Sequence, residues 1–258
     1  MHSMIGLWGG GAPKNSSLKG KKAGFTLAEV LITLGILGVV IAMTLPTVVG
    51  KYKKQATISQ LKKAYTVLSQ IVLQAQEDNG GAYFETSDNV NADATKKFFE
   101  QYWLPYFNNP TVSKEGVYPY GNYAPLKEIS GDSYGQNVFT SYSNGRIYFT
   151  AMDGTVYYIN MMQWEYEYDD DGNIVSSTAK YATIQRVFVD LNGIKPPNTL
   201  GKDVFIFQVF FDKNIVRPLG YDKTQAQINN DCSLNGVGHY CAAKIINDNW
   251  KIGKDYPW

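Results

Sequence analysis

An apolar run from Phe25 to Val49, with Glu29 as its only charged residue, constrains the fold of this chain more than any other feature. Its 25 residues rise roughly 38 Å in an α-helix, which exceeds the roughly 30 Å of a bilayer's hydrocarbon core. The run therefore predicts a transmembrane helix. A carboxylate at the bilayer centre costs roughly 2.5 to 3.5 kcal/mol, so an acid inside the run indicates a function and a partner of opposite charge.

The segment before this run, residues 1–24, is polar, glycine-rich and basic. It contains Lys14, Lys19, Lys21 and Lys22 and no acidic residue. It has no apolar core of its own, so we expect it to be held in the cytoplasm by its lysines. The alternative is an ordinary signal peptide, whose apolar region spans roughly 7 to 15 residues and ends at a small-residue cleavage site. The run here is longer and has no convincing site of that kind.

The junction between the two segments carries a family resemblance. A basic stretch ending in Gly24, then Phe25, then Glu29 as the fifth residue after the Gly-Phe bond, resembles the class III signal of type IV prepilins and type II secretion pseudopilins. The resemblance extends from Lys21 to about Leu61. It implies that a prepilin peptidase cuts after Gly24 and methylates Phe25, and that Glu29 neutralises the α-ammonium of Phe25 on an adjacent subunit. Opposite charges tolerate a low dielectric far better together than apart.

Gly35, Gly38 and Pro46 lie inside the predicted helix. Proline removes one backbone hydrogen bond and clashes with the preceding turn, and glycine lowers helix propensity. We therefore expect a kink or a locally melted stretch between Gly38 and Pro46, as in the type IV pilins that the chain resembles. The alternative is a tolerated transmembrane proline.

The apolar pattern becomes amphipathic from Lys51 onward. Apolar residues recur at spacings of three and four, which indicates one face of an α-helix: Ile58, Leu61, Tyr65, Leu68, Val72 and Ala75. Asn79-Gly80-Gly81 provides the C-terminal stop. The sequence thus predicts one helix over residues 25–79, whose upper half carries a sheet and whose lower half packs against other subunits. A free-standing coiled coil is the alternative.

The rest of the chain predicts a short helix followed by antiparallel strands. The helix covers Thr95–Leu104, and Pro110–Tyr134 is expected to be irregular. Turn residues at 144–145, 153–154 and 169–173 separate the apolar segments expected as strands: Val138–Tyr142, Arg146–Met152, Thr155–Met162 with a possible extension to Tyr168, Thr183–Leu191 and Val204–Phe211.

These elements predict an α+β, pilin-like fold in which a long N-terminal helix, half transmembrane and half amphipathic, packs on an antiparallel sheet. The expected organisation is a cleaved leader over residues 1–24, the long helix over 25–79 with its transmembrane segment at 25–49, and a globular head over 80–258. A cysteine loop near residue 240 completes the head.

The loop around Asp190, Asn192 and Asp203 brings several oxygen donors together between two strands. Oxygen ligands suit calcium, and the major pseudopilins that the chain resembles have a calcium loop near the C-terminal end. No glutamate stands at the EF-hand position. A structural turn rich in Asp and Asn is the alternative.

Cys232 and Cys241 enclose a loop of eight residues that contains His239. A free pair, a metal half-site with His239 and a disulfide all fit this spacing. An exported domain meets an oxidising compartment, which favours the disulfide. The type IV pilins that the chain resembles clasp their C-terminal segment in a similar way.

Composition excludes several functions. Four of the 24 Lys and Arg residues lie in the leader, which leaves 20 against 23 Asp and Glu, and this mildly acidic product argues against an electrostatic grip on nucleic acid. Since His2 is in the leader, only His239 remains for the head. A histidine-based metal cage or a Ser-His-Asp triad is not expected, and neither is a catalytic centre.

The resemblance implies a structural subunit, processed by a prepilin peptidase and N-methyltransferase and polymerised with other pilins into a type IV pilus or a type II secretion pseudopilus. Its partners would include an inner-membrane assembly platform. The precursor would cross the bacterial inner membrane once, with its leader cytoplasmic and its head outside. The alternatives are a minor tip pilin that binds DNA or a surface ligand, and an enzyme held by a signal anchor.

Overall fold

The computed structural model describes residues 24–80, 91–112, 125–135, 145–193, 195–211 and 213–258, and the chain divides into two compact units, Met1–Val49 and Gly50–Trp258. Most of the predicted leader and the predicted strand over Val138–Tyr142 lie outside the described residues.

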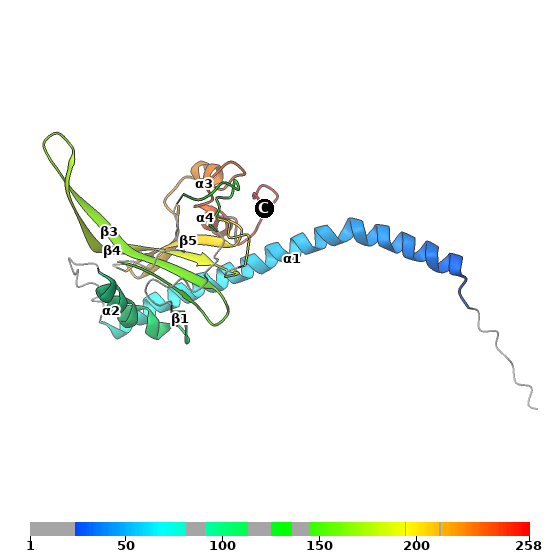
Figure 1. The fold of residues 1–258 in the computed structure, drawn as a ribbon, viewed down its shortest axis with the longest axis horizontal. Helices are drawn as coiled ribbons and strands as arrows, with labels where there is room; N and C mark the ends of the chain where they lie inside the picture. Colours follow the sequence, from blue (N-terminus) through cyan, green and yellow to red (C-terminus); the bar gives the residue numbers. More distant parts are fainter. Residues whose placement is uncertain (1–23, 81–90, 113–124, 136–144, 194, 212) are drawn as a thin grey trace, which may run out of the picture. The chain divides into compact units, whose positions relative to one another are not determined.

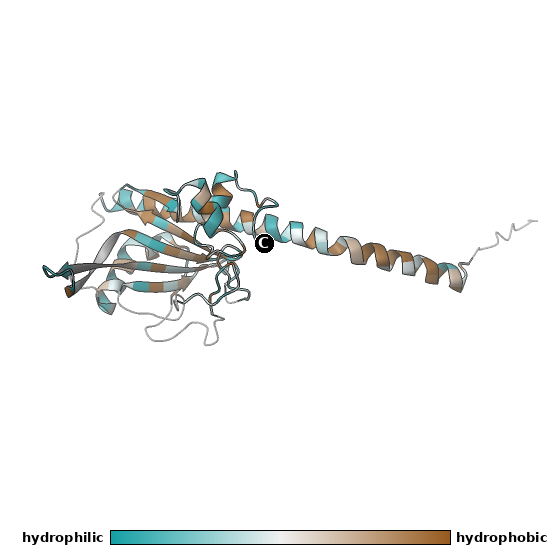
Figure 2. Cartoon of the chain, turned by 90° about the horizontal axis from the view of Figure 1, so that it is seen from above, coloured by the Kyte–Doolittle hydropathy of each residue, from teal (hydrophilic) through white to brown (hydrophobic). Residues whose placement is uncertain are grey.

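Helix α1 (Leu27–Asp78) dominates the first unit and continues into the second. Within the described residues it is the one helix that is long and apolar enough to cross a membrane. All of its residues up to Val49 are exposed, and Figure 2 shows hydrophobic residues dominating this part. The backbone is helical through Gly35, Gly38 and Pro46, so the chain as described here has no melted stretch there. A kink stays a prediction.

Helix α1 ends where the sequence predicts. Asn79 N–H donates to the carbonyl oxygen of Ala75, and Gly80 takes a positive φ of 65°. Glycine enters this left-handed region without steric penalty and so terminates helices. The predicted helix boundary at residue 79 is confirmed within one residue.

The head contains a six-stranded sheet in which every strand is antiparallel to its neighbours along the chain (Figure 1). The strands are β1 (Thr111–Val112), β2 (Arg146–Thr150), β3 (Val156–Tyr168), β4 (Ile174–Asp190), β5 (Val204–Phe210) and β6 (Ile215–Pro218). The predicted α+β, pilin-like architecture is confirmed.

Three details of the sheet differ from the prediction. Strand β1 lies in the segment expected to be irregular, β6 was not predicted, and β4 begins at Ile174 instead of Thr183. The early part of β4 is polar, but it pairs with β3 from Tyr168↔Ile174 onward, across the predicted turn at 169–173. Pairing with an existing strand thus extends β4 beyond its own apolar pattern.

Side chains alternate between the two faces of the sheet along each strand, and each face holds a buried apolar cluster. One face packs against the stripe of α1 that includes Leu61, Leu68 and Val72. Its apolar residues include Ile147, Phe149, Tyr157, Ile159, Val187, Val189, Phe205 and Phe207. The other face holds a smaller cluster around Tyr158, Phe188 and Ile206, covered by Leu126 and Leu200. The predicted stripe on α1 is therefore the main core contact.

Short helices complete the head. Helix α2 (Ala92–Tyr102) begins at Asn91, whose side chain accepts from Ala94 N–H, and a 3-10 turn, η1 (Leu104–Tyr106), follows it. The predicted helix over Thr95–Leu104 is thus confirmed with shifted ends. Helices α3 (Gln225–Asp231) and α4 (Cys241–Asn247) were not predicted. Each has only seven residues, too few to show an apolar period.

Candidate functional site

The predicted processing junction is exposed on the side that the structure describes. Phe25 is 87% exposed, and Gly24 precedes the helix without secondary structure. A Cβ added at Gly24 would meet no atom of the chain within 4 Å, and its φ lies outside the left-handed region. The described residues therefore give no steric reason for glycine at this position. A requirement for glycine would come from a protein that binds the junction.

Glu29 and Thr26 form a reciprocal cap at the start of α1. Oε2 of Glu29 accepts from the backbone N–H of Thr26 at 2.7 Å and from its hydroxyl at 2.8 Å. In return, Thr26 Oγ1 accepts from the backbone N–H of Glu29 at 3.2 Å. This arrangement satisfies backbone donors that a helix start leaves open. All of these bonds to the carboxylate use Oε2, so Oε1 has no hydrogen-bond partner among the described residues.

No contact among the described residues requires glycine at the two glycine positions further along α1. A Cβ at Gly35 or Gly38 would meet no atom within 4 Å. Small residues on a membrane helix let a second helix approach closely, and this is a contact with another molecule. The described contacts thus assign no role to Gly35, Gly38 or Pro46, and any role would lie in contacts of α1 with other molecules.

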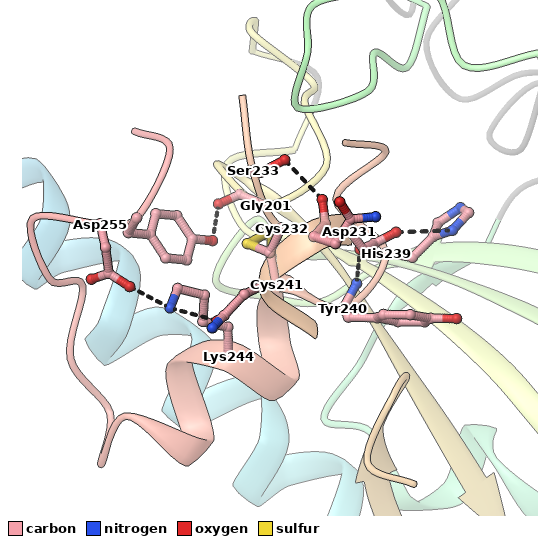
Figure 3. Close-up of a disulfide and its surroundings, with 12 residues drawn as sticks. Gly201, Asp231, Cys232, Ser233, His239, Tyr240, Cys241, Lys244 and Asp255 are labelled. Atoms are coloured by element: carbon pink, nitrogen blue, oxygen red, sulfur yellow. Dashed lines mark hydrogen bonds and ion pairs between the residues drawn. A yellow bond between two sulfur atoms is a disulfide. The ribbon is translucent and has the colours of Figure 1, made fainter. Parts of the chain in front are cut away.

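At the other end of the chain, Cys232 and Cys241 form a disulfide with a Cα–Cα distance of 5.0 Å (Figure 3). Both cysteines are buried in the main core cluster. The predicted disulfide is confirmed, and the sulfur atoms are therefore not metal ligands. The bond joins the end of α3 to the start of α4.

Asp231 and His239 flank this bond and belong to one polar cluster. Oδ1 of Asp231 accepts from Tyr240 N–H at 2.6 Å, and His239 Nε2 lies 3.0 Å from the Tyr134 hydroxyl. His239 Nδ1 is 3.9 Å from Asp231 Oδ2. Burial lowers the pKa of His239 against the pull of Asp231, and burial raises the pKa of Asp231. The cluster ties the disulfide loop to the segment over 125–135.

The tail beyond α4 is held by a buried cation. The Lys244 side chain is 3% exposed, and its Nζ lies 2.6 Å from Asp255 Oδ2 and 3.3 Å from Asp248 Oδ2. Burial alone would lower the pKa of Lys244, but its bonds to Asp255 and Asp248 outweigh this and raise it. The buried Tyr256 hydroxyl donates to the Gly201 carbonyl oxygen.

The tail also reaches α1. The Trp250 and Tyr65 ring centroids lie 5.8 Å apart, and Tyr65 in turn contacts Phe207 of β5. Ile245 of α4 belongs to the core under the sheet, whereas Trp250 lies on α1.

In the candidate calcium loop, the carboxylate oxygens accept hydrogen bonds from the loop itself. Asp203 is buried and accepts from Thr199 N–H at 2.6 Å, Asn198 N–H at 2.8 Å and Asn192 Nδ2 at 3.0 Å. Asp190 Oδ1 accepts from Asn192 N–H at 3.1 Å. Burial raises the pKa of Asp203 against these bonds. The bonds support the alternative of an Asx-rich turn.

One observation fits a cation in this loop. Asn192 Oδ1 is buried and accepts no hydrogen bond from the described residues, and oxygen ligands of this kind suit calcium. Within the described residues, no three His, Cys, Asp or Glu side chains gather as a metal site. Calcium at Asp190, Asn192 and Asp203 therefore stays a prediction.

Three residues that contribute to these sites, Thr26, Tyr134 and Lys244, were not predicted from the sequence. Thr26 could have been found, because Thr-x-x-Glu is the pattern of a capping box. Tyr134 and Lys244 could not, since the hydrogen bond between Tyr134 and His239 spans 105 residues, and two partners of Lys244, Asn229 and Asp255, lie 15 and 11 residues away from it.

Comparison with protein-family models gives two matches. Residues 47–258 match a model described as a family of unknown function (DUF6613). Residues 19–45 match the prokaryotic N-terminal methylation motif, which is the signal of type IV prepilins and pseudopilins. A search of curated proteins and one of solved structures gave no match.

Proposed function

Since the chain belongs to the family of unknown function that matches residues 47–258, and carries the prepilin methylation signal before it, we propose that it is a subunit of a membrane-assembled filament. The signal makes the chain a prepilin-type precursor with a structural role. The proposal adds that the mature subunit polymerises, into either a type IV pilus or a type II secretion pseudopilus.

Glu29 carries this proposal. Its Oε2 is occupied by Thr26, while its Oε1 has no hydrogen-bond partner among the described residues. A carboxylate oxygen offers two lone pairs, so Oε1 can accept from a cation on another molecule. Cleavage after Gly24 would create such a cation at Phe25 of each neighbouring subunit. Assembly would then depend on processing, because the uncut precursor lacks the ammonium group.

The accessible junction and the exposed apolar helix support the same proposal. A prepilin peptidase and N-methyltransferase would bind the segment around Gly24 and modify Phe25. The precursor would be stored in the bacterial inner membrane through residues 25–49, with its leader cytoplasmic and its head outside. An inner-membrane platform would then pass the subunits into the filament. No catalytic role is proposed for the head.

The test combines mass spectrometry with filament yield. The mature chain should begin with methylated Phe25, and replacing Gly24 by a bulky residue should leave the uncut precursor in the membrane. Glu29→Val should be inserted and cleaved, yet yield at least about tenfold fewer filaments, because a loss of about 1.4 kcal/mol per contact already changes an equilibrium tenfold.

Thr26→Val provides the matched control, since it removes the hydroxyl's bonds with the Glu29 carboxylate and with the Glu29 backbone N–H, while it keeps the backbone bond from Thr26 and the charge of Glu29. It should retain more assembly than Glu29→Val. A mature chain that starts after Ala42, or Glu29→Val subunits that build filaments at the normal yield, would contradict the proposal.

A further inference from the structure

A ring of basic and aromatic residues surrounds α1 at the start of the second unit. We call Lys51, Tyr52, Lys53, Lys54 and Trp258 the collar. Tyr52 is 74% exposed and Trp258 is 37% exposed, and Lys51 and Lys53 are exposed as well. Lys54 Nζ lies 5.8 Å from the Trp258 ring centroid, in the geometry of a cation–π contact. Figure 1 shows the chain end beside α1, where Trp258 joins the collar.

The positive charge of the collar is not neutralised by any described residue. Between Glu29 and Glu77, α1 carries five lysines and no acidic residue. Lys63 is paired with Asp153 at 2.7 Å, and Lys62 lies over the Trp250 ring. The collar lysines form no ion pair with any described residue. Lys51 and Lys53 therefore face solvent, and the half-buried Lys54 lies over Trp258, without a counter-charge among the described residues.

The covalent chain places the collar at the edge of the apolar segment. Lys51 follows Val49 by two residues, and two trans peptide units span at most about 8 Å. The headgroup region of a bilayer is roughly 5 to 8 Å thick on each side. With Val49 at the edge of the hydrocarbon core, Lys51 thus lies at headgroup depth, and Tyr52 lies about 1.5 Å further along the helix. Tyr and Trp are enriched at this depth, and lysine side chains extend to it.

The topology of the precursor does not explain these lysines. The positive-inside rule calls for basic residues on the cytoplasmic flank, which the leader provides, and it calls for none on the opposite flank. After cleavage the leader lysines are gone, and the collar holds the only basic side chains that border the apolar segment.

The distribution of the collar favours lipid over a protein partner. Successive helical residues are about 100° apart, so residues 51–54 cover the whole circumference of α1. A docking surface for one protein would occupy one face of the helix. Headgroups surround a single spanning helix on all sides, and anionic headgroups match the charge.

We propose that the collar binds the headgroups of anionic phospholipids in the outer leaflet of the membrane that α1 crosses, and so fixes the depth of the stored subunit. This inference rests on the proposed membrane storage. The collar must leave the headgroups when the subunit enters a filament, so the lipid composition controls how readily subunits are extracted.

The experiment uses the full chain in nanodiscs of phosphatidylcholine, alone or with one third phosphatidylglycerol. Lysine acetylation rates are read by mass spectrometry. Lys51, Lys53 and Lys54 should react at least about threefold more slowly in the anionic discs, and 0.5 M salt should largely abolish the difference, because salt screens exposed charges. Lys96 and Lys97 of α2, which are also exposed, serve as internal controls and should react equally in both discs.

A variant pair tests the aromatic part. Quenching of tryptophan fluorescence by brominated phosphatidylglycerol should fall when Trp258 is replaced by Phe. It should also fall in Lys51→Gln/Lys53→Gln/Lys54→Gln, but not in the charge-matched Lys96→Gln/Lys97→Gln/Lys213→Gln.

Three outcomes overturn the inference. Equal acetylation in both lipids would show that the headgroups do not engage the collar. Equal protection by inorganic phosphate in phosphatidylcholine discs would show a general anion site. Protection that follows the number of copies per disc, whatever the lipid, would assign the collar to a second copy of the chain. If instead urea strips the chain from the discs, the proposed membrane storage itself fails.

Discussion

Polar side chains near both ends of this chain are positioned by hydrogen bonds or ion pairs with specific partners. Glu29 is held by Thr26 at one end, and His239 lies between Tyr134 and Asp231 at the other. Lys244 is buried against Asp255. Each polar side chain is thus positioned by a hydrogen bond or ion pair, at the exposed Glu29 as well as at the buried Lys244.

His239 should make the disulfide loop sensitive to acid. Burial lowers the pKa of His239 below its usual 6.5, with Arg186 acting in the same direction and Asp231 and Glu128 against it. As the pH falls through 6.5, the unfolded chain therefore binds a proton before the folded chain does, and the stability of the fold decreases until the pH reaches the folded pKa. Melting of the head should occur at a lower temperature at pH 6 than at pH 7.5.

His239→Gln keeps a hydrogen-bonding side chain without a titrating ring, so the change between pH 7.5 and pH 6 should shrink in this variant. The comparison stops at pH 6 because burial raises the pKa of Asp231, and its protonation at lower pH acts in the opposite direction. A melting temperature that rises on acidification in the wild-type head would contradict this account.

Among the elements, the segment from α3 to Trp258 depends most on a cross-link. The disulfide closes a short loop, and Lys244, Tyr256 and Trp250 anchor the residues that follow. Without such contacts a chain end frays. The loop over Asp190–Asp203 is the second element of this kind, since its carboxylates organise the backbone around them.

Replacing Cys232 and Cys241 together by Ala should lower the free energy of unfolding by about 2 to 3 kcal/mol, the value expected for a loop of this length. The tail over residues 242–258 should become sensitive to protease first, while α1 keeps its protection. Limited proteolysis followed by mass spectrometry measures the protease sensitivity of the tail and of α1. Early cleavage within α1 would show that the bond supports the whole head.

Two reactive thiols in the exported, unreduced protein would show that the bond is absent, and zinc binding with His239 would then be tested.

If the Asp190–Asp203 loop binds calcium, a chelator should lower the melting temperature of the head, since a ligand that binds only the folded state stabilises it. Asp203→Ala should remove this difference. Asp169→Ala is a matched control, because Asp169 caps an exposed turn far along the sheet. An unchanged melting temperature with chelator would leave the hydrogen-bonded turn as the full account.

The whole molecule joins an exposed apolar helix segment to a head with its own core. The described residues up to Val49 contribute nothing to that core, whereas the part of α1 after Gly50 lies beneath the sheet. An exposed apolar surface of this kind marks an interaction site, and under the proposed function the membrane or other subunits would bury it.

The abundance of this chain in filaments separates a major subunit from a minor tip pilin. The signal at Gly24 and Phe25 is common to both. A major subunit should dominate the protein sheared from cells, whereas a tip protein should be nearly absent from it. Quantitative mass spectrometry of sheared filaments measures the ratio. The imaging of those filaments also distinguishes a surface pilus from a secretion pseudopilus.

The sequence by itself determined the parts of this protein that depend on local pattern. The apolar run, the amphipathic stripe with its Gly80 stop and the turns at 153–154 and 169–173 set the long helix and most of the meander, because helix and strand periods are local properties. The signal around Gly24 and Glu29 is likewise contiguous. Only the tertiary structure decided that β4 begins at Ile174, that Tyr134 meets His239, and that the tail lies on α1 through Trp250. These contacts join residues far apart in the chain, and no local pattern encodes which distant partner a strand edge or a buried polar side chain will find.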